Sequence, residues 1–332
     1  MTPPPLRIGI LGAARIARKF ADGVAGSSTA HVVAVASRDR ERAAAFAHTL
    51  GVPSVFESYD ALLASPDVDA VYNPLPNGLH GPWSIRAMDA GKHVLCEKPL
   101  AVSRVEAERM FDSARRNRVC LAEAFPYRSQ PQTHMLQQLL ADGAIGRVRM
   151  ITATFAFTLT NAADIRLDPG LGGGALMDLG SYPLSFIRMI TGEAPTTLQA
   201  IGDLHPSGVD SSAMVTLGFA NGMFAQASCS FTAAVHRQAL IAGEDGVIET
   251  TYANHTSADA APGLFIRRGR ENRDVPEMIP VAAMNGFRAE AEAFADYVAG
   301  SPWTGMPERE SVDVAGMLET LRLLVAAGAS VR

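Results

Sequence analysis

Two short apolar runs near the start of the chain, joined by one helix-like stretch, constrain the fold more than any other feature. The runs are residues 7–11 and 31–36, and the segment between them opens with a glycine turn and continues as a helix to about residue 25. Two strands joined by one crossover helix are typical of a βαβ unit, whose strands are parallel. The chain is therefore predicted to begin as an α/β sheet.

The turn after the first strand is a variant of the glycine fingerprint that binds dinucleotides. Gly12, Ala14 and Ala17 occupy its three glycine positions. The first glycine permits a tight turn, and the second position lets the backbone approach a pyrophosphate at the start of the helix. Ala14 adds a methyl group, which is expected to hold the pyrophosphate slightly further away. A plain strand-to-helix turn is the alternative, and the βαβ context favours the dinucleotide site. The residues expected to contact the cofactor here are Gly12, Ala13, Ala14, Arg15 and Ile16.

The residues after the second strand indicate which cofactor is bound. An acidic residue there would bind a ribose 2′-hydroxyl, but the chain has Ser37-Arg38, with Arg42 one helical turn later. A hydroxyl and two guanidiniums suit a 2′-phosphate, which arginine binds through two hydrogen bonds. NADP is therefore favoured over NAD. Asp39 could pair with an arginine or point at solvent. The alternative is that Arg38, Arg40 and Arg42 form a solvated helix face.

A carboxylate and an ammonium follow a later buried strand, residues 94–95. The residues are Glu97 and Lys98, and Pro99 comes next. Sheets of the α/β class usually perform their chemistry at the carboxyl ends of strands. The proline fixes its own φ and restricts Lys98 to an extended backbone. The lysine is therefore expected to be held at a defined place in the site.

A second strand end supplies a loop. Residues 73–80 follow the strand 70–72 and are rich in proline, asparagine and glycine, which is typical of a loop. This loop is expected to line the cofactor cleft through Leu75, Asn77 and His80. His80 could also be a simple loop histidine, an equal alternative.

The second half of the chain has one glycine-rich landmark, residues 172–174, followed by a helix predicted over 175–190. Asp178 and Tyr182 are four apart and so are expected on one face of that helix. The plainer alternative is a surface charge and a half-buried aromatic ring. Short strand-like runs between residues 196 and 267 then predict an antiparallel sheet, and helices are predicted over 287–298 and 312–327.

Together these motifs resemble the glucose–fructose oxidoreductase / inositol dehydrogenase (Gfo/Idh/MocA) family. The glycine turn, the 74–80 loop, the segment 90–99 ending in Glu-Lys-Pro and the segment 124–128 follow the family order, and the resemblance covers nearly the whole chain. It implies an α/β protein in which an N-terminal Rossmann-type doubly wound parallel sheet, residues 1–125, binds NADP. Residues 126–332 are then an α+β domain with an open, mostly antiparallel sheet that binds substrate and forms oligomers, and the last helices can pack back on the first domain.

The resemblance also implies the chemistry. In the family the Glu-Lys-Pro lysine, an aspartate on the helix after the Gly-Gly motif and, four residues later, usually a histidine carry the proton steps. Tyr182 replaces that histidine, as in a subgroup of dimeric trans-dihydrodiol dehydrogenases, NADP-dependent D-xylose dehydrogenases and some sugar ketoreductases. Tyr182 is then the acid/base, with Lys98 opposite it lowering the phenol pKa, and Asp178 orients substrate or lysine. Tyr127, Asp178 and Tyr182 are expected to contact substrate. Glu97 is expected either to set the position of Lys98 or to contact the nicotinamide end, and Arg166 to reach a polyol or the nicotinamide side. Lys98, Glu97 and Arg166 are all counted among the expected cofactor contacts.

The function implied is an NADP-dependent oxidoreductase that interconverts a secondary alcohol or hemiacetal and a carbonyl on a sugar or cyclic diol. One alternative is a reductase of a nucleotide-linked or anhydro keto-sugar. Another, of a different class, is a non-catalytic NADP-sensing regulatory protein on the same fold. The sequence fixes neither the substrate nor the direction of the reaction.

The net charge and the cysteine content limit which partners and which cellular compartment are expected. The net charge of −5 gives no electrostatic reason to expect nucleic acid or an anionic membrane as a partner. The three widely spaced cysteines fit neither a disulfide framework nor a zinc site, so no metal and a cytoplasmic location are expected. No signal-peptide pattern or membrane-length apolar run is present, and residues 1–5 are expected to be a loose tail. A homodimer or homotetramer through the C-terminal sheet is expected, with Met223, Phe224 and Phe231 as contributors.

Overall fold

The computed structural model describes residues 4–254, 263–271 and 275–329, so most of the expected N-terminal tail lies outside the described residues. Contacts divide the chain into two compact units. The first unit comprises Met1–Ala101, Val105–Ser129 and Asn285–Glu308, and the second comprises Val102–Arg104, Gln130–Met284 and Arg309–Arg332. Residues 126–129 and 285–308 therefore group with the first unit rather than with the second half of the chain. In the described ranges no helix combines the length and apolarity needed to cross a membrane.

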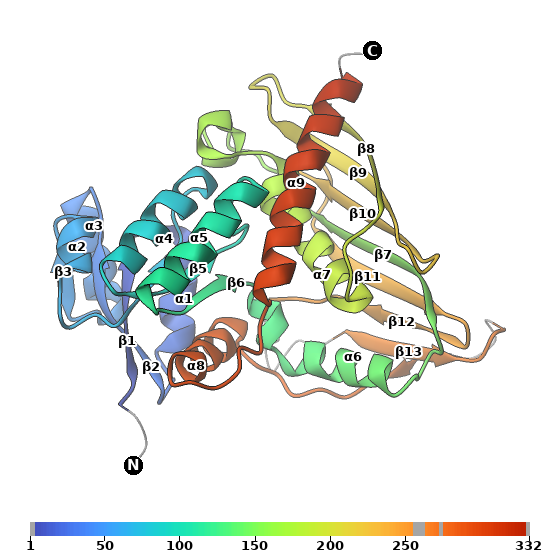
Figure 1. Ribbon diagram of the computed structural model, residues 1–332, viewed down its shortest axis with the longest axis horizontal. Coiled ribbons are helices and arrows are strands. Elements are labelled where there is room, and N and C mark those ends of the chain that lie inside the picture. The colour runs from blue at the N-terminus through green and yellow to red at the C-terminus, as the bar shows by residue number, and fades with distance from the viewer. Residues whose placement is uncertain (1–3, 255–262, 272–274, 330–332) are drawn as a thin grey trace. The chain divides into compact units, whose positions relative to one another are not determined.

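The first unit is built on a six-stranded parallel sheet. Its strands are β1 (Leu6–Leu11), β2 (Ala30–Ala36), β3 (Ser54–Phe56), β4 (Ala70–Asn73), β5 (His93–Glu97) and β6 (Leu121–Ala124). This unit contains the blue-to-teal ribbon of Figure 1. The strand order is β3-β2-β1-β4-β5-β6, so the order in which the strands are added changes direction between β1 and β4. Ligands of doubly wound sheets bind at such a switch point, outside the carboxyl ends of the strands. The predicted Rossmann-type sheet is confirmed.

Helices cover both faces of this sheet. They are α1 (Arg15–Val24), α2 (Arg40–Leu50), α3 (Tyr59–Leu63), α4 (His80–Asp89), α5 (Arg104–Asn117) and α8 (Gly286–Val298), with 3₁₀ turns η1 (Asn77–Leu79) and η2 (Pro126–Ser129). Right-handed crossovers place α1 and α2 on one face and α4 and α5 on the other. Helix α8 packs against α1 and η2. Its Phe287 and Phe294 join the buried core, in which Phe20 stacks on Tyr72 with ring centroids 3.8 Å apart.

The second unit is built on an eight-stranded sheet with the order β14-β13-β12-β11-β7-β10-β9-β8. Its strands are β7 (Val148–Ala156), β8 (Thr197–Leu204), β9 (Asp210–Gly218), β10 (Phe224–Ser230), β11 (His236–Gly243), β12 (Gly246–Thr250), β13 (Leu264–Arg268) and β14 (Glu277–Met278). Strands β7 and β10 pair in parallel, and the other neighbours are antiparallel. The mostly antiparallel sheet is therefore confirmed, and β14 is a short strand that the sequence did not predict.

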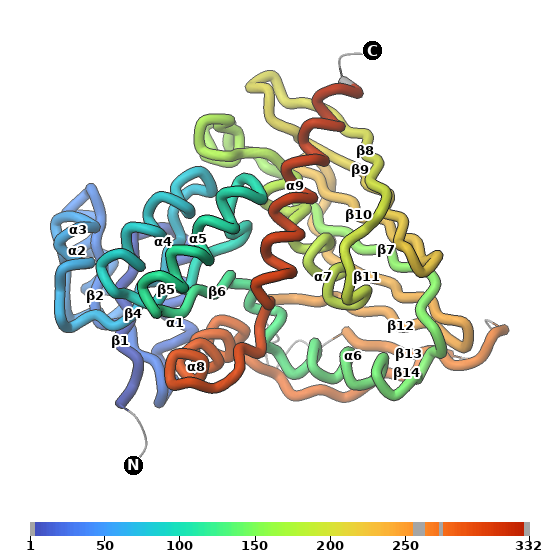
Figure 2. Tube along the Cα trace, in the orientation of Figure 1, coloured from blue at the N-terminus to red at the C-terminus, as the bar shows by residue number. Residues whose placement is uncertain are grey.

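In the described part of the chain, helices cover one face of this sheet and leave large side chains of the other face exposed. Helices α7 (Ser181–Thr191) and α9 (Glu308–Ala329) lie along one face, while α6 (Pro131–Ala141) lies near β12 and β13 (Figure 2). Along β9 the side chains of Val215 and Leu217 are buried, whereas Met214 is 58% exposed. Because successive side chains of a strand point to opposite faces, this alternation defines a covered inner face and an open outer face.

The outer face carries several large apolar side chains. Phe224 and Met150 are register partners on β10 and β7, and both are 59% exposed. Ile201 and Met214 are register partners on β8 and β9, and Ile201 is 67% exposed. The expectation that Met223 and Phe231 contribute to this face is wrong, because both side chains are buried. Each of them flanks β10, just outside the alternating part of the strand.

Candidate active site

The turn after β1 has the geometry that a pyrophosphate needs. Gly12 has φ +94°, a left-handed conformation that favours glycine, and its N–H donates to the carbonyl oxygen of Ala36 at 2.7 Å. Helix α1 starts at Arg15, and its N-cap residue Ala14 makes no side-chain capping bond. The first N–H groups of a helix need partners from outside the helix and favour an anion there. A Cβ at Gly12 would lie 3.3 Å from Cδ2 of Leu75, so the turn and the loop after β4 adjoin.

The three arginines that follow β2 have different surroundings. Asp39 is the N-cap of α2 and accepts the backbone N–H of Arg42 at 3.0 Å, which gives this carboxylate a capping role. Arg40 pairs with Glu57 at 2.9 Å. Arg38 and Arg42 instead act on a phenol from α3, described next. Arg38 and Arg42, the two guanidiniums predicted for the 2′-phosphate, therefore both act on Tyr59, and their contact with the cofactor stays a prediction.

Tyr59 is the phenol in this cluster, and the sequence analysis did not single it out. Burial raises its pKa, while the positive charges of Arg38 and Arg42 and a hydrogen bond from Arg38 act in the opposite direction. A Cβ at Gly12 would lie 3.5 Å from the Tyr59 hydroxyl. The phosphate turn and the arginine cluster are thus neighbours. The position of Tyr59 three residues after the carboxyl end of β3, at the start of α3, is the signal that could have identified it.

The expectation that His80 lines the cofactor cleft is not supported, because its side chain is buried. Its ring is 1% exposed, and its Nδ1 and Nε2 lie 2.8 Å from the carbonyl oxygen of Pro99 and 2.7 Å from that of Leu75. Burial lowers its pKa to about 4. The neutral imidazole has a single N–H and donates to one of these two carbonyl oxygens, and the buried side chain lies between the β4 loop and the Glu97-Lys98-Pro99 segment instead of facing a ligand.

The end of β5 is anchored by Glu97. Its buried carboxylate accepts the hydroxyl of Tyr72 at 2.5 Å and the backbone N–H of Lys98 at 3.2 Å. These bonds hold the backbone of Lys98 in place, while its side chain is half-buried. The contact expected between Glu97 and the nicotinamide end stays a prediction, as do the cofactor contacts of Asn77 and Ser37.

In the second unit the predicted helix 175–190 is not one continuous α-helix, which is a correction. Residues Leu176–Gly180 form a π-helical turn, η5, and α7 begins at Ser181. The carboxylate of Asp210 on β9 accepts the N–H of Leu176 at 2.6 Å, at the start of this turn. Gly174 has φ +119°, and a Cβ there would clash with Asp210. A π-helical turn has i→i+5 hydrogen bonds and therefore more residues per turn than an α-helix. The four-residue spacing of Asp178 and Tyr182 therefore does not place them on one face as it would in an α-helix.

Asp178 is held by an arginine. Nε of Arg166, in the 3₁₀ turn η3 (Ile165–Leu167), donates to Oδ2 of Asp178 at 2.5 Å, and Asp164 lies 3.2 Å from the same guanidinium. Both carboxylates raise the pKa of Arg166, the Asp178 charge most strongly. The expected cofactor contact of Arg166 stays a prediction, and the structure gives this residue a definite partner within its own unit.

Tyr182 lies at the start of α7 and is 6% exposed. Its hydroxyl oxygen accepts a hydrogen bond from Nδ2 of Asn254 at 2.9 Å. Phe155 of β7 packs edge-on against its ring with centroids 5.2 Å apart, and the Arg237 guanidinium of β11 lies 4.2 Å from the ring centroid. Asn254 was not predicted as a site residue, and Arg237 was predicted only as part of a segment, residues 236–238, expected to shape the substrate pocket. The β11–β7 register brings Arg237 here, Asn254 follows β12, and no local sequence motif marks either residue.

Tyr127, expected to contact substrate, lies in η2. Its side chain is buried and packs edge-on against Phe125 with centroids 5.9 Å apart. Its contact with substrate stays a prediction. The expectation that Lys98 lies opposite Tyr182 stays a prediction, because the two residues belong to different units.

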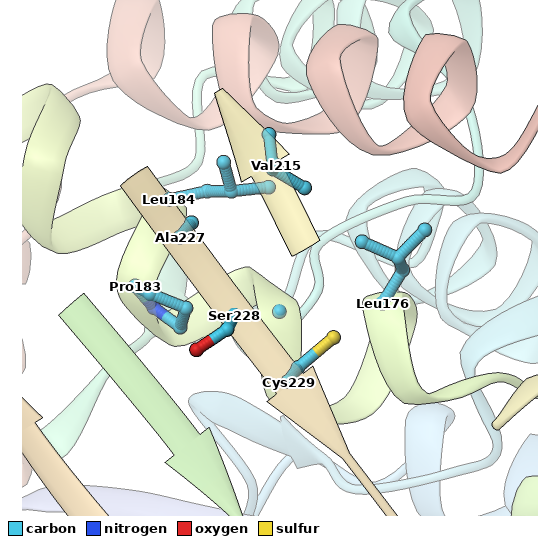
Figure 3. A pocket seen from close by; sticks show the side chains of 8 residues that line it. Leu176, Pro183, Leu184, Val215, Ala227, Ser228 and Cys229 are labelled. Carbon is cyan, nitrogen blue, oxygen red and sulfur yellow. The ribbon is translucent and has the colours of Figure 1, made fainter. Parts of the chain in front are cut away.

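A narrow gap near the start of α7 is packing rather than a ligand site. It lies between η5 and α7 and the inner face of β9 and β10 and is too small for a water molecule (Figure 3). Its lining is Leu176, Gly180, Pro183, Leu184, Val215, Ala227, Ser228 and Cys229. No charged side chain is among them. Within the described ranges no cluster of His, Cys, Asp and Glu is arranged to hold a metal ion.

Both halves of the chain match models of known protein families. Residues 6–125 match the oxidoreductase family with an NAD-binding Rossmann fold, and residues 133–249 match the GFO/IDH/MocA C-terminal domain. The chain belongs to the GFO/IDH/MocA oxidoreductase family.

Three members of the family illustrate which proteins this chain is similar to. The chain is 36% identical to D-xylose 1-dehydrogenase (NADP(+)) 2 of Haloferax volcanii, over 98% of this chain and 99% of that protein. It is 35% identical to trans-1,2-dihydrobenzene-1,2-diol dehydrogenase of Mus musculus, over 74% of each chain. A crystal structure of a 3-ketoreductase from Actinomadura kijaniata in complex with NADP and TDP-benzene superimposes with a TM-score of 0.88 at 32% identity, over 97% of this chain and 98% of that one. The subgroup that the Tyr182 motif resembled is confirmed.

Proposed function

We propose that this protein is an NADP-dependent oxidoreductase that interconverts a CH–OH group and a carbonyl on a sugar or cyclic diol. The observation that carries the proposal is the full-length similarity to a sugar dehydrogenase named for NADP(+). It is supported by a second relative named as a diol dehydrogenase. Tyr182, Lys98 and Asp178, on which the family chemistry depends, are all present in the chain.

The first unit fits NADP. The uncapped start of α1 and the left-handed turn at Gly12 suit the pyrophosphate, and Arg38 and Arg42 suit the 2′-phosphate. We expect the Tyr59 hydroxyl to contact the same phosphate, because Arg38 is hydrogen-bonded to Tyr59. When bound, NADP supplies the hydride acceptor or donor for the reaction.

The proton step is assigned to Tyr182. In the oxidation direction its phenolate would take the proton of the substrate hydroxyl, and in reduction its phenol would return one to the carbonyl oxygen. Lys98 supplies a positive charge that favours the developing alkoxide. Asp178, held by Arg166, orients the substrate. The hydrogen bond from Asn254 supports the role of Tyr182, since a donor at the phenol oxygen stabilises the charged form.

A second candidate activity is reduction of a nucleotide-linked keto-sugar. It is favoured by the close structural similarity to a 3-ketoreductase solved with TDP-benzene. The same residues serve both reactions, because reduction is the reverse of alcohol oxidation. The two candidates differ in the substrate and in the physiological direction.

A substrate panel tests the proposal. Purified protein is mixed with NADP and, in turn, aldoses, trans-dihydrodiols and anhydrosugars, and with NADPH and nucleotide-linked keto-sugars, while the absorbance of the reduced cofactor is followed. Turnover with a free sugar or diol supports the first candidate, and turnover with the nucleotide-linked ketone alone supports the second. Absence of turnover with every member, in a protein that binds NADP, would leave the regulatory alternative.

We further propose that the outer face of the eight-stranded sheet pairs with a second copy of the chain, giving a homodimer or homotetramer. The register pairs Phe224–Met150 and Ile201–Met214 form its exposed apolar part, and exposed apolar patches of this kind commonly mark protein interfaces. Phe224→Glu is expected to convert the oligomer to a smaller species in light scattering. An unchanged mass would argue against this face.

We also propose a cytoplasmic location. Cys96, Cys120 and Cys229 are all free thiols, as expected in a reducing compartment.

A further inference from the structure

Arg237 lies among three aromatic rings beside Tyr182. Its guanidinium carbon is 4.2 Å from the ring centroid of Tyr182, 4.6 Å from that of Tyr252 and 4.9 Å from that of Phe155. Arg237 and Phe155 are register partners on β11 and β7. Both therefore project from the inner face of the sheet, which α7 covers, and the register itself delivers the cation to the tyrosine.

This arrangement has an electrostatic consequence for the phenol. A cation over an aromatic face is attracted by the electron density of the ring. A phenolate ring carries more of that density than a phenol ring, so the guanidinium favours the charged form of Tyr182. The N–H of Asn254, which donates to the phenol oxygen at 2.9 Å, acts in the same direction.

We propose that Arg237 is a positioning residue for the acid/base step, which holds the Tyr182 ring and stabilises its phenolate. The inference rests on the proposed function, in which Tyr182 exchanges the substrate proton. It adds a second cation to the scheme, one that belongs to the same unit as the tyrosine and acts through its ring and not through the substrate.

Among the described residues, the other titratable groups near Tyr182 or on the elements around it have partners or are neutral. Asp178 in η5 is bound to Arg166, and Arg188 further along α7 is bound to Asp313. The Tyr252 hydroxyl donates to the carbonyl oxygen of Thr154, and the ring of His236 on β11 contacts the hydroxyl of the same threonine. Burial raises the pKa of the Cys229 thiol on β10, which keeps it neutral. Among these described groups Arg237 is the cation stacked on the Tyr182 ring.

The test compares Arg237→Gln, which removes the charge, with Arg237→Lys, which keeps it. The pH dependence of kcat for alcohol oxidation is measured for each, with Tyr182→Phe alongside. The phenol of Tyr182 is also titrated directly, as the ultraviolet absorbance of tyrosinate in each protein minus that of the matching Tyr182→Phe protein. Arg270→Gln, in an exposed pair with Asp245, is the charge-matched control.

The midpoint of the tyrosinate titration and of the pH–rate profile is expected to rise by about one pH unit in Arg237→Gln, as for a partly desolvated cation–π contact. Arg237→Lys is expected to recover most of that shift, and Arg270→Gln to show none. An unchanged midpoint in Arg237→Gln overturns the inference, and so does an equal shift in Arg237→Lys, which would point to packing instead of charge. If Tyr182→Phe retains near-normal turnover, the proposed acid/base role of Tyr182 fails. The effect of Arg237 on the Tyr182 phenol is read separately, from the tyrosinate titration.

Discussion

Nε of Arg166 donates a hydrogen bond to Oδ2 of Asp178 across 2.5 Å, which joins η3 to the π-helical turn before Tyr182. The side chains are 29% and 14% exposed, so the pair is largely shielded from solvent. Arg166→Met leaves the Asp178 carboxylate without its main partner. We expect it to lower the free energy of unfolding by about 2 kcal/mol, measured by urea denaturation. The double variant with Asp178→Asn is expected to regain part of this loss, and a purely additive double variant would show that the pair is not coupled.

Tyr182→Phe removes the hydroxyl that is proposed to exchange the substrate proton. We expect kcat to fall by at least about 100-fold at neutral pH, the usual size of a general acid/base contribution, with little change in thermal stability. Tyr297→Phe, which alters a half-buried tyrosine on α8, is the matched control and is expected to keep normal turnover. Comparable activity in the two variants would contradict the assignment of Tyr182.

Arg38→Ala is expected to raise the Michaelis constant for NADP about 10-fold to 100-fold, the equivalent of one or two charge-assisted hydrogen bonds, and to change that for NAD little. Tyr59→Phe is expected to act in the same direction with a smaller effect. Arg40→Ala is the control, because this arginine lies in the same segment but pairs with Glu57. Initial rates with each cofactor provide the measurement. Equal changes for NADP and NAD in Arg38→Ala would refute the 2′-phosphate assignment.

Asp313 on α9 binds two arginines of its own unit. It accepts from Nε of Arg188, which is 2% exposed, at 3.0 Å and from Arg104 at 3.1 Å. Asp313→Ala is expected to lower the free energy of unfolding by about 3 kcal/mol, because it leaves a buried guanidinium unpaired. Glu308→Ala breaks an exposed pair with Arg115 and is expected to cost less than about 1 kcal/mol. Chemical denaturation of both variants makes the comparison, and similar losses would show that burial of Arg188 is not decisive.

His80 predicts a pH dependence of stability. Its pKa is about 4 in the folded protein, below the value of about 6.5 in an unfolded chain. The unfolded chain therefore binds more protons between these values, so the His80 contribution is present above pH 6.5 and is lost as the pH falls toward 4. We expect a difference of at most about 3 kcal/mol. His80→Gln, whose amide does not titrate but keeps a hydrogen-bond donor, should flatten this part of the curve, and an unchanged pH dependence would contradict the assignment.

The sequence was most informative where local signals coincide. The βαβ unit, the turn at Gly12, the arginines after β2 and the strand end at Lys98 depend on turn residues and on short apolar runs. Such features are encoded within a few residues of each other, so they could be predicted together with the parallel sheet. The doubly wound fold follows from the same alternation.

Other features depend on contacts between distant parts of the chain. Arg237 meets Tyr182 because β11 pairs with β7, and this register is set by the whole sheet rather than by residues near position 237. The π-helical turn before α7 forms beside Asp210, a residue of β9 with no motif around it. His80 has the residue type of a ligand contact, and only its burial and its contacts with two backbone carbonyl oxygens show that it is structural.

The division of the chain has a consequence for the order in which it can fold during synthesis. The dinucleotide-type sheet is complete by residue 124, yet the core beneath it also contains Phe287 and Phe294 of α8. Domains commonly fold in order as they leave the ribosome, the N-terminal one first. Here the N-terminal unit must wait until about the last tenth of the chain is being made before its core can close. A ribosome-bound fragment ending near residue 130 is therefore expected to be protease-sensitive, and one that exposes residue 308 fully should be protected.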